Sequence, residues 1–236
     1  MDPPKLATAG AFHMTIMTHP PCMDYPALDT VAGFGREKLV ELAGKHGLGL
    51  PDLACPGVRQ DLLYASRRNF TGELLYPAAL PCLLHYQTAL KLNAAQQHLM
   101  HDGCGLLIWD AWRPPEAQVL LWNRVRDPSF VARPQPGKRG SWHCYGRAVD
   151  VALVDGRSGV LLPLPSDLDD FSPQGRPNLE GRSADAARTL EKLQRAMEAA
   201  GFHLLDSEWW HFSDPVTPPP EAPVWGAALG LTTLSP

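Results

Sequence analysis

The sequence has few cysteines, and their arrangement argues against the two kinds of structure that cysteines most often build. Its 236 residues include five cysteines and no Cys-x-x-Cys pair. An odd number without paired spacing argues against a disulfide framework and against a zinc site made of thiolates. We therefore expect reduced, partly buried thiols at all five positions, which are Cys22, Cys55, Cys82, Cys104 and Cys144.

The sequence also lacks an excess of positive charge, a long hydrophobic run and a recognisable leader. The formal net charge of −4 argues against a nucleic-acid partner, because proteins that bind nucleic acids usually present a basic face. No stretch approaches the roughly 20 apolar residues of a membrane-spanning helix, so we expect no membrane partner. The residues from Met1 to Lys5 do not open a basic segment followed by an apolar run. The sequence therefore predicts no signal peptide and a cytoplasmic protein.

The length and the prolines indicate one domain with long irregular segments. A chain of 236 residues with 44% hydrophobic residues can bury a sizeable core. The 24 prolines gather in clusters, which favours rigid turns over a helical bundle. We expect an N-terminal extension over residues 1–60 packed on the core, the main domain over 61–214 and a proline-rich tail over 215–236 on the surface. No internal repeat is visible, and the oligomeric state is not predicted.

Hydrophobic periodicity and turn residues predict a mixture of helices and strands. The helical spacing of apolar residues, with a glycine after several of these segments, predicts helices over 36–46, 84–101, 116–126 and from Ser183 or Asp185 to Ala200. Short apolar or β-branched runs predict strands over 106–109, 148–153, 202–205 and 209–212, with 160–162 as a hairpin partner of 148–153. Because strands and helices do not alternate regularly, the fold class that we predict is α+β.

The phrase Ser-Trp-His-Cys-Tyr-Gly-Arg-Ala-Val-Asp over residues 141–150 carries the first candidate ligands. His143 lies where a loop meets a strand, and Gly146 allows a sharp turn there. Asp150 lies between two valines, and a carboxylate buried in such a strand needs a partner or a metal. Asp150 could instead face solvent on an alternating strand, so this phrase alone does not decide the question.

The phrase Ser-Glu-Trp-Trp-His over residues 207–211 supplies the second half of the site. Residues three apart on a strand point to opposite faces, so Glu208 and His211 can meet at one site only if the strand kinks or ends there. Alternatively, Glu208 is solvated and His211 packs beside the tryptophans. Taken together, the two phrases favour a site. His143, Asp150 and His211 could bind one zinc ion and leave a position for water, and Glu208 could act as the base.

Arg113 adds a cation at the end of a predicted buried strand. It closes the phrase Trp-Asp-Ala-Trp-Arg over residues 109–113. A fixed guanidinium there could stabilise an oxyanion during hydrolysis. An ordinary surface pair with Asp110 or Glu116 is the alternative that spacing alone favours.

These phrases, in this order, resemble the D-alanyl-D-alanine dipeptidases, the zinc dipeptidases of the vancomycin-resistance type. The resemblance rests on Ser-x-His-x-x-Gly-x-Ala-x-Asp, Glu-Trp-Trp-His and Trp-Asp-x-Trp-Arg-Pro, supported by Tyr-Ala over residues 64–65 and Asn-Phe-Thr-Gly over 69–72. It runs from about residue 61 to residue 214. Residues 171–175 and the side chains that flank His143 depart from the family pattern.

The resemblance implies a role for each matched residue. His143, Asp150 and His211 would be the ligands of one zinc ion, Glu208 the general base and acid, and Arg113 the oxyanion-stabilising group. Tyr64, Ser141 and Asp169 would bind the substrate, with Asp169 on its free ammonium, although Asp167 and Asp170 lie next to that position.

The implied fold is a small zinc-peptidase fold of the Hedgehog/DD-peptidase type, with a central antiparallel sheet flanked by helices. The implied reaction is hydrolysis of D-Ala-D-Ala or a close D-configured dipeptide, in cell-wall dipeptide recycling or in resistance to glycopeptide antibiotics. The alternatives are a zinc D,D-carboxypeptidase or endopeptidase acting on peptidoglycan peptides, and a catalytically silent zinc-binding domain of the same fold.

Overall fold

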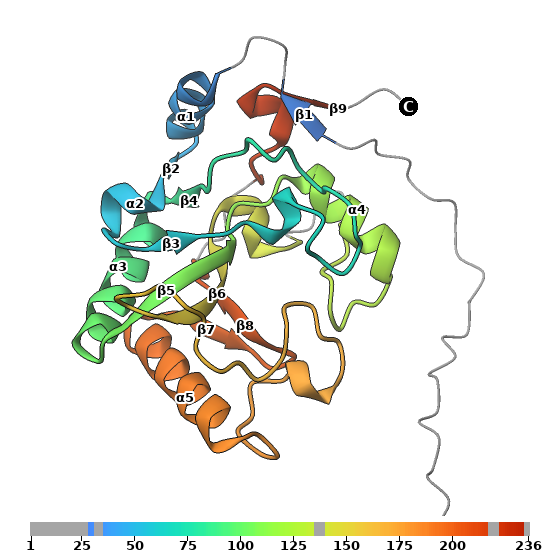
Figure 1. The fold of residues 1–236 in the computed structure, drawn as a ribbon. Helices are drawn as coiled ribbons and strands as arrows, with labels where there is room; N and C mark the ends of the chain where they lie inside the picture. The colour runs from blue at the N-terminus through green and yellow to red at the C-terminus, as the bar shows by residue number, and fades with distance from the viewer. Residues whose placement is uncertain (1–27, 31–34, 135–139, 217–221, 234–236) are drawn as a thin grey trace, which may run out of the picture.

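A five-stranded sheet forms the centre of the molecule (Figure 1). The computed structural model describes residues 28–30, 35–134, 140–216 and 222–233. The strand order is β3-β5-β6-β8-β7, and the strands are β3 (Arg59–Gln60), β5 (Cys104–Asp110), β6 (Ala148–Asp155), β8 (Glu208–Ser213) and β7 (His203–Leu205). Every pairing is antiparallel except that of β3 with β5, which is parallel. The prediction of an antiparallel sheet is thus right for four strands and wrong for the edge strand β3.

Two long helices cover one face of this sheet. Helices α3 (Tyr86–His101) and α5 (Ala184–Ala199) contact each other and the strands, and their apolar residues join those of β5, β6 and β8 in one buried cluster. Helix α5 begins where the sequence predicts, because the Ser183 side chain accepts a hydrogen bond from the backbone amide of Ala186. β6 is buried from Ala148 to Val154, since strands flank it on both sides and apolar side chains pack on it. It is therefore a rigid support for Asp150.

A second buried cluster surrounds helix α4 (Pro115–Val125) and helix α1 (Arg36–Lys45). The smaller elements around it are α2 (Pro51–Ala54) and the pairs β2 (Leu48–Gly49) with β4 (Leu84–His85) and β1 (Leu28–Thr30) with β9 (Leu231–Thr233). Four short 3-10 helices complete the described chain: η1 (Leu63–Ala65), η2 (Trp142–Tyr145), η3 (Pro173–Gly175) and η4 (Gly226–Leu229). The described residues therefore contain two separate buried apolar clusters.

The C-terminal segment corrects one prediction. Leu229 and Leu231 are almost fully buried in the second cluster, and the backbone amide of Gly226 donates a hydrogen bond to Glu116. The prediction that the proline-rich tail lies on the surface is therefore wrong for Gly226, Leu229 and Leu231, although Ala227 and Ala228 between them are exposed. The prediction rested on the prolines alone and did not take into account the apolar residues that follow them.

The remaining secondary-structure predictions have mixed outcomes. The structure places the other helices and strands within two residues of most predicted ends. Residues 160–162 fold back antiparallel on the end of β6, as predicted, but the isolated bridge between Leu161 and Val154 is too short to make them a strand. The four cysteines in the described residues are free and buried, as expected, whereas Cys22 lies outside them. Among the described helices, none is long and apolar enough to cross a membrane.

Candidate active site

The three candidate ligands converge from two strands and the turn before one of them. Asp150 on β6 lies directly opposite His211 on β8 in the antiparallel register. His143 reaches them from η2, where Gly146 ends the 3-10 helix with a left-handed φ of 63°. A Cβ atom at Gly146 would lie 2.5 Å from Leu48 and 2.8 Å from the backbone nitrogen of His85, so no side chain fits there. Glycine at this position therefore lets the turn bring His143 over the sheet.

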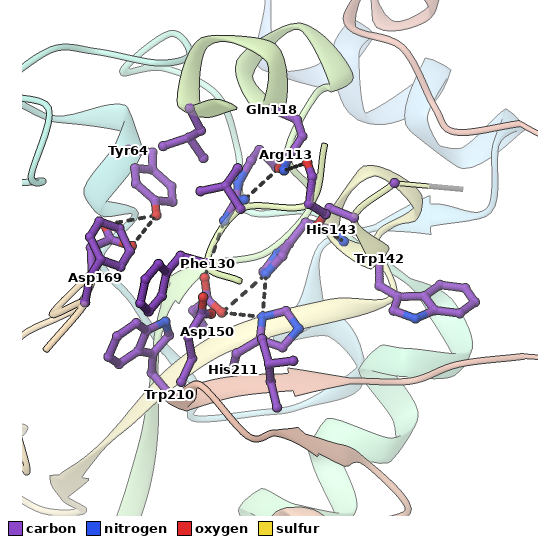
Figure 2. A pocket seen from close by; sticks show the side chains of 18 of the residues that line it. Tyr64, Arg113, Gln118, Phe130, Trp142, His143, Asp150, Asp169, Trp210 and His211 are labelled. Carbon is purple, nitrogen blue, oxygen red and sulfur yellow. Dashed lines mark hydrogen bonds and ion pairs between the residues drawn. The ribbon is translucent and has the colours of Figure 1, made fainter. Parts of the chain in front are cut away.

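The donor atoms of these residues form a small triangle (Figure 2). Nδ1 of His211 lies 3.0 Å from Oδ1 of Asp150 and 3.1 Å from Nε2 of His143, and the third side measures 3.3 Å. Zinc bonds of about 2.0–2.1 Å in tetrahedral geometry put neighbouring donor atoms about 3.3 Å apart. The triangle thus has the size that one zinc ion needs, and all three residues line a cavity.

A second contact fixes the orientation of His143. Its Nδ1 lies 2.7 Å from the carbonyl oxygen of Ala111, and only a protonated Nδ1 can donate a hydrogen bond there. That tautomer leaves the lone pair on Nε2, the atom in the triangle. Metal-binding histidines are commonly oriented in this way by a carbonyl or carboxylate on the other nitrogen.

The protonation states of the other two ligands also suit a metal. Burial opposes ionisation of Asp150, but its electrostatic interactions and hydrogen bonds with the neighbouring rings of His143 and His211 hold the pKa of its carboxyl well below the usual range. Burial lowers the pKa of His211, which favours the neutral imidazole. A carboxylate and neutral imidazoles are the forms that bind zinc. The donor set and its environment therefore fit the ion.

Glu208 lines the same cavity without belonging to the triangle. It is the first residue of β8, and the pairing of β7 with β8 shifts register between Leu204 and Leu205, opposite it. This irregular strand end lets Glu208 and His211 face one cavity although they are three residues apart. Burial raises the pKa of Glu208 well above its ordinary value, and the charges of Asp150 and Asp169 add to the effect. Such a carboxyl group suits proton transfer near neutral pH.

Arg113 is buried beside the triangle and held by two partners. Its Nε donates to Asp110 at 2.8 Å, and its Nη1 donates to Gln118 at 2.8 Å. Its Nη2 lies 3.5 Å from Asp150. Burial opposes the charge, but Asp110, Tyr64 and Asp150 raise the pKa of the guanidinium above its ordinary value. Arg113 is therefore a fixed buried cation: it pairs with Asp110, as the alternative had it, but inside the protein and not on its surface.

Asp110 is the buried residue that organises this part of the site. A bulge in β5 between Ile108 and Asp110 places Asp110 opposite Asp150. Its carboxylate accepts hydrogen bonds from Arg113 and from the Tyr76 hydroxyl at 2.7 Å, and lies 3.4 Å from His143. From the sequence, Asp110 is expected only as a possible surface partner of Arg113. Its buried role could have been inferred from its place directly after the predicted buried strand 106–109, because a carboxylate there needs a partner.

Tyr64 and Asp169 lie at the opposite end of the cavity, which we call the amine end; the triangle and Arg113 form the metal end (Figure 2). The Tyr64 hydroxyl donates to both carboxylate oxygens of Asp169, at 2.8 and 3.0 Å. Asp169 has a left-handed φ of 60°, a conformation that aspartate tolerates better than most residues. Burial raises the pKa of Asp169 to about 7. The structure thus presents Asp169, and not Asp167 or Asp170, to the cavity.

Ser141 lies on the metal side of the cavity wall. Its side chain accepts a hydrogen bond from the backbone amide of His143 at 3.3 Å and so caps the 3-10 helix η2. It also lines the cavity. All eight residues singled out from the sequence therefore line one cavity of about 170 Å³.

Comparison with known proteins places the sequence in a family. The family model described as D-ala-D-ala dipeptidase matches residues 47–223. The chain belongs to the D-Ala-D-Ala dipeptidase family. The match begins before residue 61 and ends after residue 214, so it includes parts of the expected N-terminal extension and of the expected tail. The division of the chain into these three parts stays a prediction.

Several curated members of this family are similar to the chain. The D-alanyl-D-alanine dipeptidase of Escherichia coli (strain K12) is 33% identical over 168 residues, which cover 70% of this chain and 84% of the relative. That of Enterococcus faecium is 30% identical over 66% of this chain and 85% of the relative. That of Enterococcus faecalis is 29% identical over 71% and 91%. The similarity to these dipeptidases therefore covers most of the chain.

Proposed function

We propose that this protein is a zinc dipeptidase that hydrolyses D-Ala-D-Ala or a closely related D-configured dipeptide. The observation that carries the proposal is the position of Glu208. A structural zinc site needs no additional buried carboxyl group beside it, whereas a hydrolytic site needs a base next to the attacking water. The names of the relatives support the same substrate. The fold that we propose is the small zinc-peptidase fold of the Hedgehog/DD-peptidase type.

His143, Asp150 and His211 would hold one zinc ion per chain. When bound, the ion would lower the pKa of a coordinated water toward about 7 and polarise the scissile carbonyl. The three ligands are fixed by the sheet, by the turn at Gly146 and by the carbonyl of Ala111. The protein therefore holds its donor atoms in place before any ligand arrives.

The residues of the chain provide the proton transfers. Glu208 takes a proton from the attacking water while the water oxygen forms a bond to the scissile carbon. It then returns this proton to the nitrogen of the breaking peptide bond, so that two free amino acids leave. Arg113 faces the carbonyl oxygen as that oxygen becomes negative, and its contacts with Asp110 and Gln118 keep it in position.

The amine end would restrict the enzyme to dipeptides. Asp169, held by Tyr64, would bind the free ammonium of the substrate, and a longer peptide that ends in D-Ala-D-Ala has no ammonium at that distance from its last peptide bond. The cavity volume agrees with this restriction, because a cavity of about 150 Å³ holds a benzene molecule. A cavity of this size suits a small molecule better than an extended peptide chain.

A hydrolysis assay with three substrates tests this proposal. Protein loaded with zinc is incubated with D-Ala-D-Ala, L-Ala-L-Ala and a pentapeptide that ends in D-Ala-D-Ala, and the released amino acids are quantified. We expect hydrolysis of the D-dipeptide alone. Release of D-Ala from the pentapeptide but not from the dipeptide would show a carboxypeptidase. Stoichiometric zinc without hydrolysis of any substrate would show a silent zinc-binding domain.

A variant separates the base from the metal site. Glu208→Gln keeps the size of the side chain and removes the proton acceptor, so it should retain one zinc ion and lose kcat by roughly 10²–10⁴-fold. Zinc content is measured by atomic emission on the same sample. A variant that keeps its zinc and its turnover would refute the assignment of Glu208.

A further inference from the structure

Three phenylalanine rings from three separate loops meet at the amine end of the cavity. We call Phe70, Phe130 and Phe171 the aromatic wall. The Phe171 ring lies 5.2 Å from the Phe70 ring in an edge-to-face arrangement and 4.9 Å from the Phe130 ring. All three rings line the cavity that holds Glu208 and Asp169. Phe171 is the middle ring, because it contacts both of the others.

The aromatic wall lies next to the group that would bind the substrate's ammonium. Phe171 follows Asp169 by two residues in the same loop. Figure 2 shows Phe130 on the same side of the cavity as Asp169 and Tyr64, with the metal ligands across from them. Leu121 and Val131 continue the apolar lining beside these rings. This end of the cavity therefore combines one carboxylate with an otherwise apolar surface.

The covalent structure of a dipeptide connects these two features. The ammonium and the side chain of its amino-terminal residue are attached to the same carbon atom. When the ammonium is bound at Asp169 and the scissile carbonyl lies at the metal end, that side chain branches from the carbon between them, one bond from the ammonium, and so lies within reach of the surface around Asp169. The carboxy-terminal residue lies beyond the scissile bond, on the side of Ser141 and Trp142, which also line the cavity.

We propose that the aromatic wall is the subsite for the side chain of the substrate's amino-terminal residue, and that Phe171 limits the size of the side chain it accepts. This inference rests on the proposed dipeptidase function. The subsite takes a small apolar side chain, because the rings leave little space. It rejects a charged side chain, because the wall offers no partner for a desolvated charge.

Two series of dipeptides test the assignment. One series varies the amino-terminal residue (D-Ala-D-Ala, D-Val-D-Ala, D-Leu-D-Ala, D-Asp-D-Ala), and the other varies the carboxy-terminal residue (D-Ala-D-Val, D-Ala-D-Leu). The value of kcat/KM is measured for the zinc-loaded wild type and for Phe171→Ala. In the wild type, D-Leu-D-Ala should be a poorer substrate than D-Ala-D-Ala by about 10- to 200-fold, the range that added methylenes produce in a tight pocket.

Phe171→Ala should change the first series and not the second. We expect the kcat/KM ratio of D-Leu-D-Ala to D-Ala-D-Ala to rise at least about tenfold, because the removed ring makes room for the larger side chain. The ratio of D-Ala-D-Leu to D-Ala-D-Ala should stay within about twofold of the wild-type ratio. Phe70→Ala should act in the same direction but less, because Phe70 is 41% exposed and lies at the rim.

Control variants separate a subsite from mere support of the loop. Leu179→Ala alters an exposed residue after Phe171 that lies outside the cavity lining, and it should leave both series unchanged. If the wall only supports Asp169, Phe171→Ala will lower kcat/KM for every substrate by the same factor, and the inference is wrong. Phe171→Leu, which retains apolar bulk, tests the same ratio if Phe171→Ala does not fold. If the wild type hydrolyses none of the dipeptides, the proposed function itself has failed.

Discussion

The metal end and the amine end belong to one cavity, but the protein holds them in different ways. At the metal end, His143, Asp150 and Arg113 are almost fully buried, and each has at least two partners within the fold. At the amine end, Asp169 comes from a loop, is only half-buried and, among the residues that the structure describes, accepts hydrogen bonds from the Tyr64 hydroxyl alone. The metal end is thus fixed by the sheet, whereas the amine end depends on loops.

This difference indicates a division of labour between the two ends. A reaction centre must keep its donor atoms within a few tenths of an ångström, and a sheet with buried ion pairs provides that precision. A recognition site on loops can change its shape without disturbing the reaction centre. We therefore expect substitutions at the metal end to abolish turnover, and substitutions at the amine end to alter affinity and selectivity.

The largest effect should come from Asp150→Ala. This change would remove a proposed zinc ligand and take away a buried carboxylate that contacts Arg113 and both imidazoles. We expect loss of stoichiometric zinc and a fall in kcat of at least about 10⁴-fold. Metal content and turnover are measured on the same preparation, and circular dichroism checks that the variant folds. A folded variant with full zinc and more than a small fraction of wild-type turnover would contradict the role of Asp150 as a ligand.

The next largest effect should come from Arg113→Ala. Loss of a fixed cation that faces a developing oxyanion costs roughly 10²–10³-fold in kcat. Because Arg113 would act in the transition state, KM for D-Ala-D-Ala should change much less than kcat. The matched control is Arg124→Ala, which removes an exposed arginine of the nearby helix α4 that pairs with Glu73. A large increase in KM with an unchanged kcat would mean that Arg113 binds the substrate instead.

The two ends also differ in how well the sequence predicts them. The metal end is readable because two of the three candidate ligands lie in strands, where apolar neighbours reveal burial, and the third lies in the turn just before one of them. His143 and Asp150 lie within one phrase, and Glu208 and His211 within another. The antiparallel register that brings Asp150 opposite His211 then follows from the pairing of β6 with β8. Most helices are predicted for the same reason, since their apolar residues repeat at helical spacing.

The features that the sequence does not reveal depend on loops or on distant pairings. The aromatic wall joins residues 70, 130 and 171, which share no period and no strand. The organising role of Asp110 depends on a bulge in β5 that no residue pattern announces. The parallel pairing of β3 with β5 and the burial of Leu229 join segments far apart in the chain. In each case tertiary contacts, and not local preference, decide the structure.

A moderate effect is expected from Asp169→Asn, at the amine end. This change keeps the shape of the side chain but removes the charge that would pair with the substrate's ammonium. Hydrogen bonds to charged groups contribute about 1.5–3 kcal/mol, which corresponds to roughly 10- to 150-fold in KM. We expect kcat to change by less than about threefold, because the metal end is built independently.

Asp167→Asn is the matched control for this prediction. Asp167 lies in the same acidic run but is exposed and does not line the cavity. It should therefore leave KM unchanged. An equal increase in KM for both variants would indicate a general electrostatic effect of the loop and would remove the distinction that the structure makes between these carboxylates.

The smallest effect is a shift in the pH dependence of KM. Burial raises the pKa of the Asp169 carboxyl to about 7, while the hydrogen bond from Tyr64 lowers it. Below this pH the carboxyl group is protonated and cannot pair with an ammonium ion, so KM for D-Ala-D-Ala should rise as the pH falls through 7. Tyr64→Phe removes the stabilising hydrogen bond from the carboxylate and so raises the pKa. The rise in KM should then begin at a higher pH than in the wild type.

Steady-state kinetics between about pH 5 and 9, a range centred on this transition, measure the shift. Asp169→Asn has no titrating group at this position and should show no such transition, with or without Tyr64. If the transition persists in Asp169→Asn, another group causes it, and Tyr64 serves the amine end by packing alone.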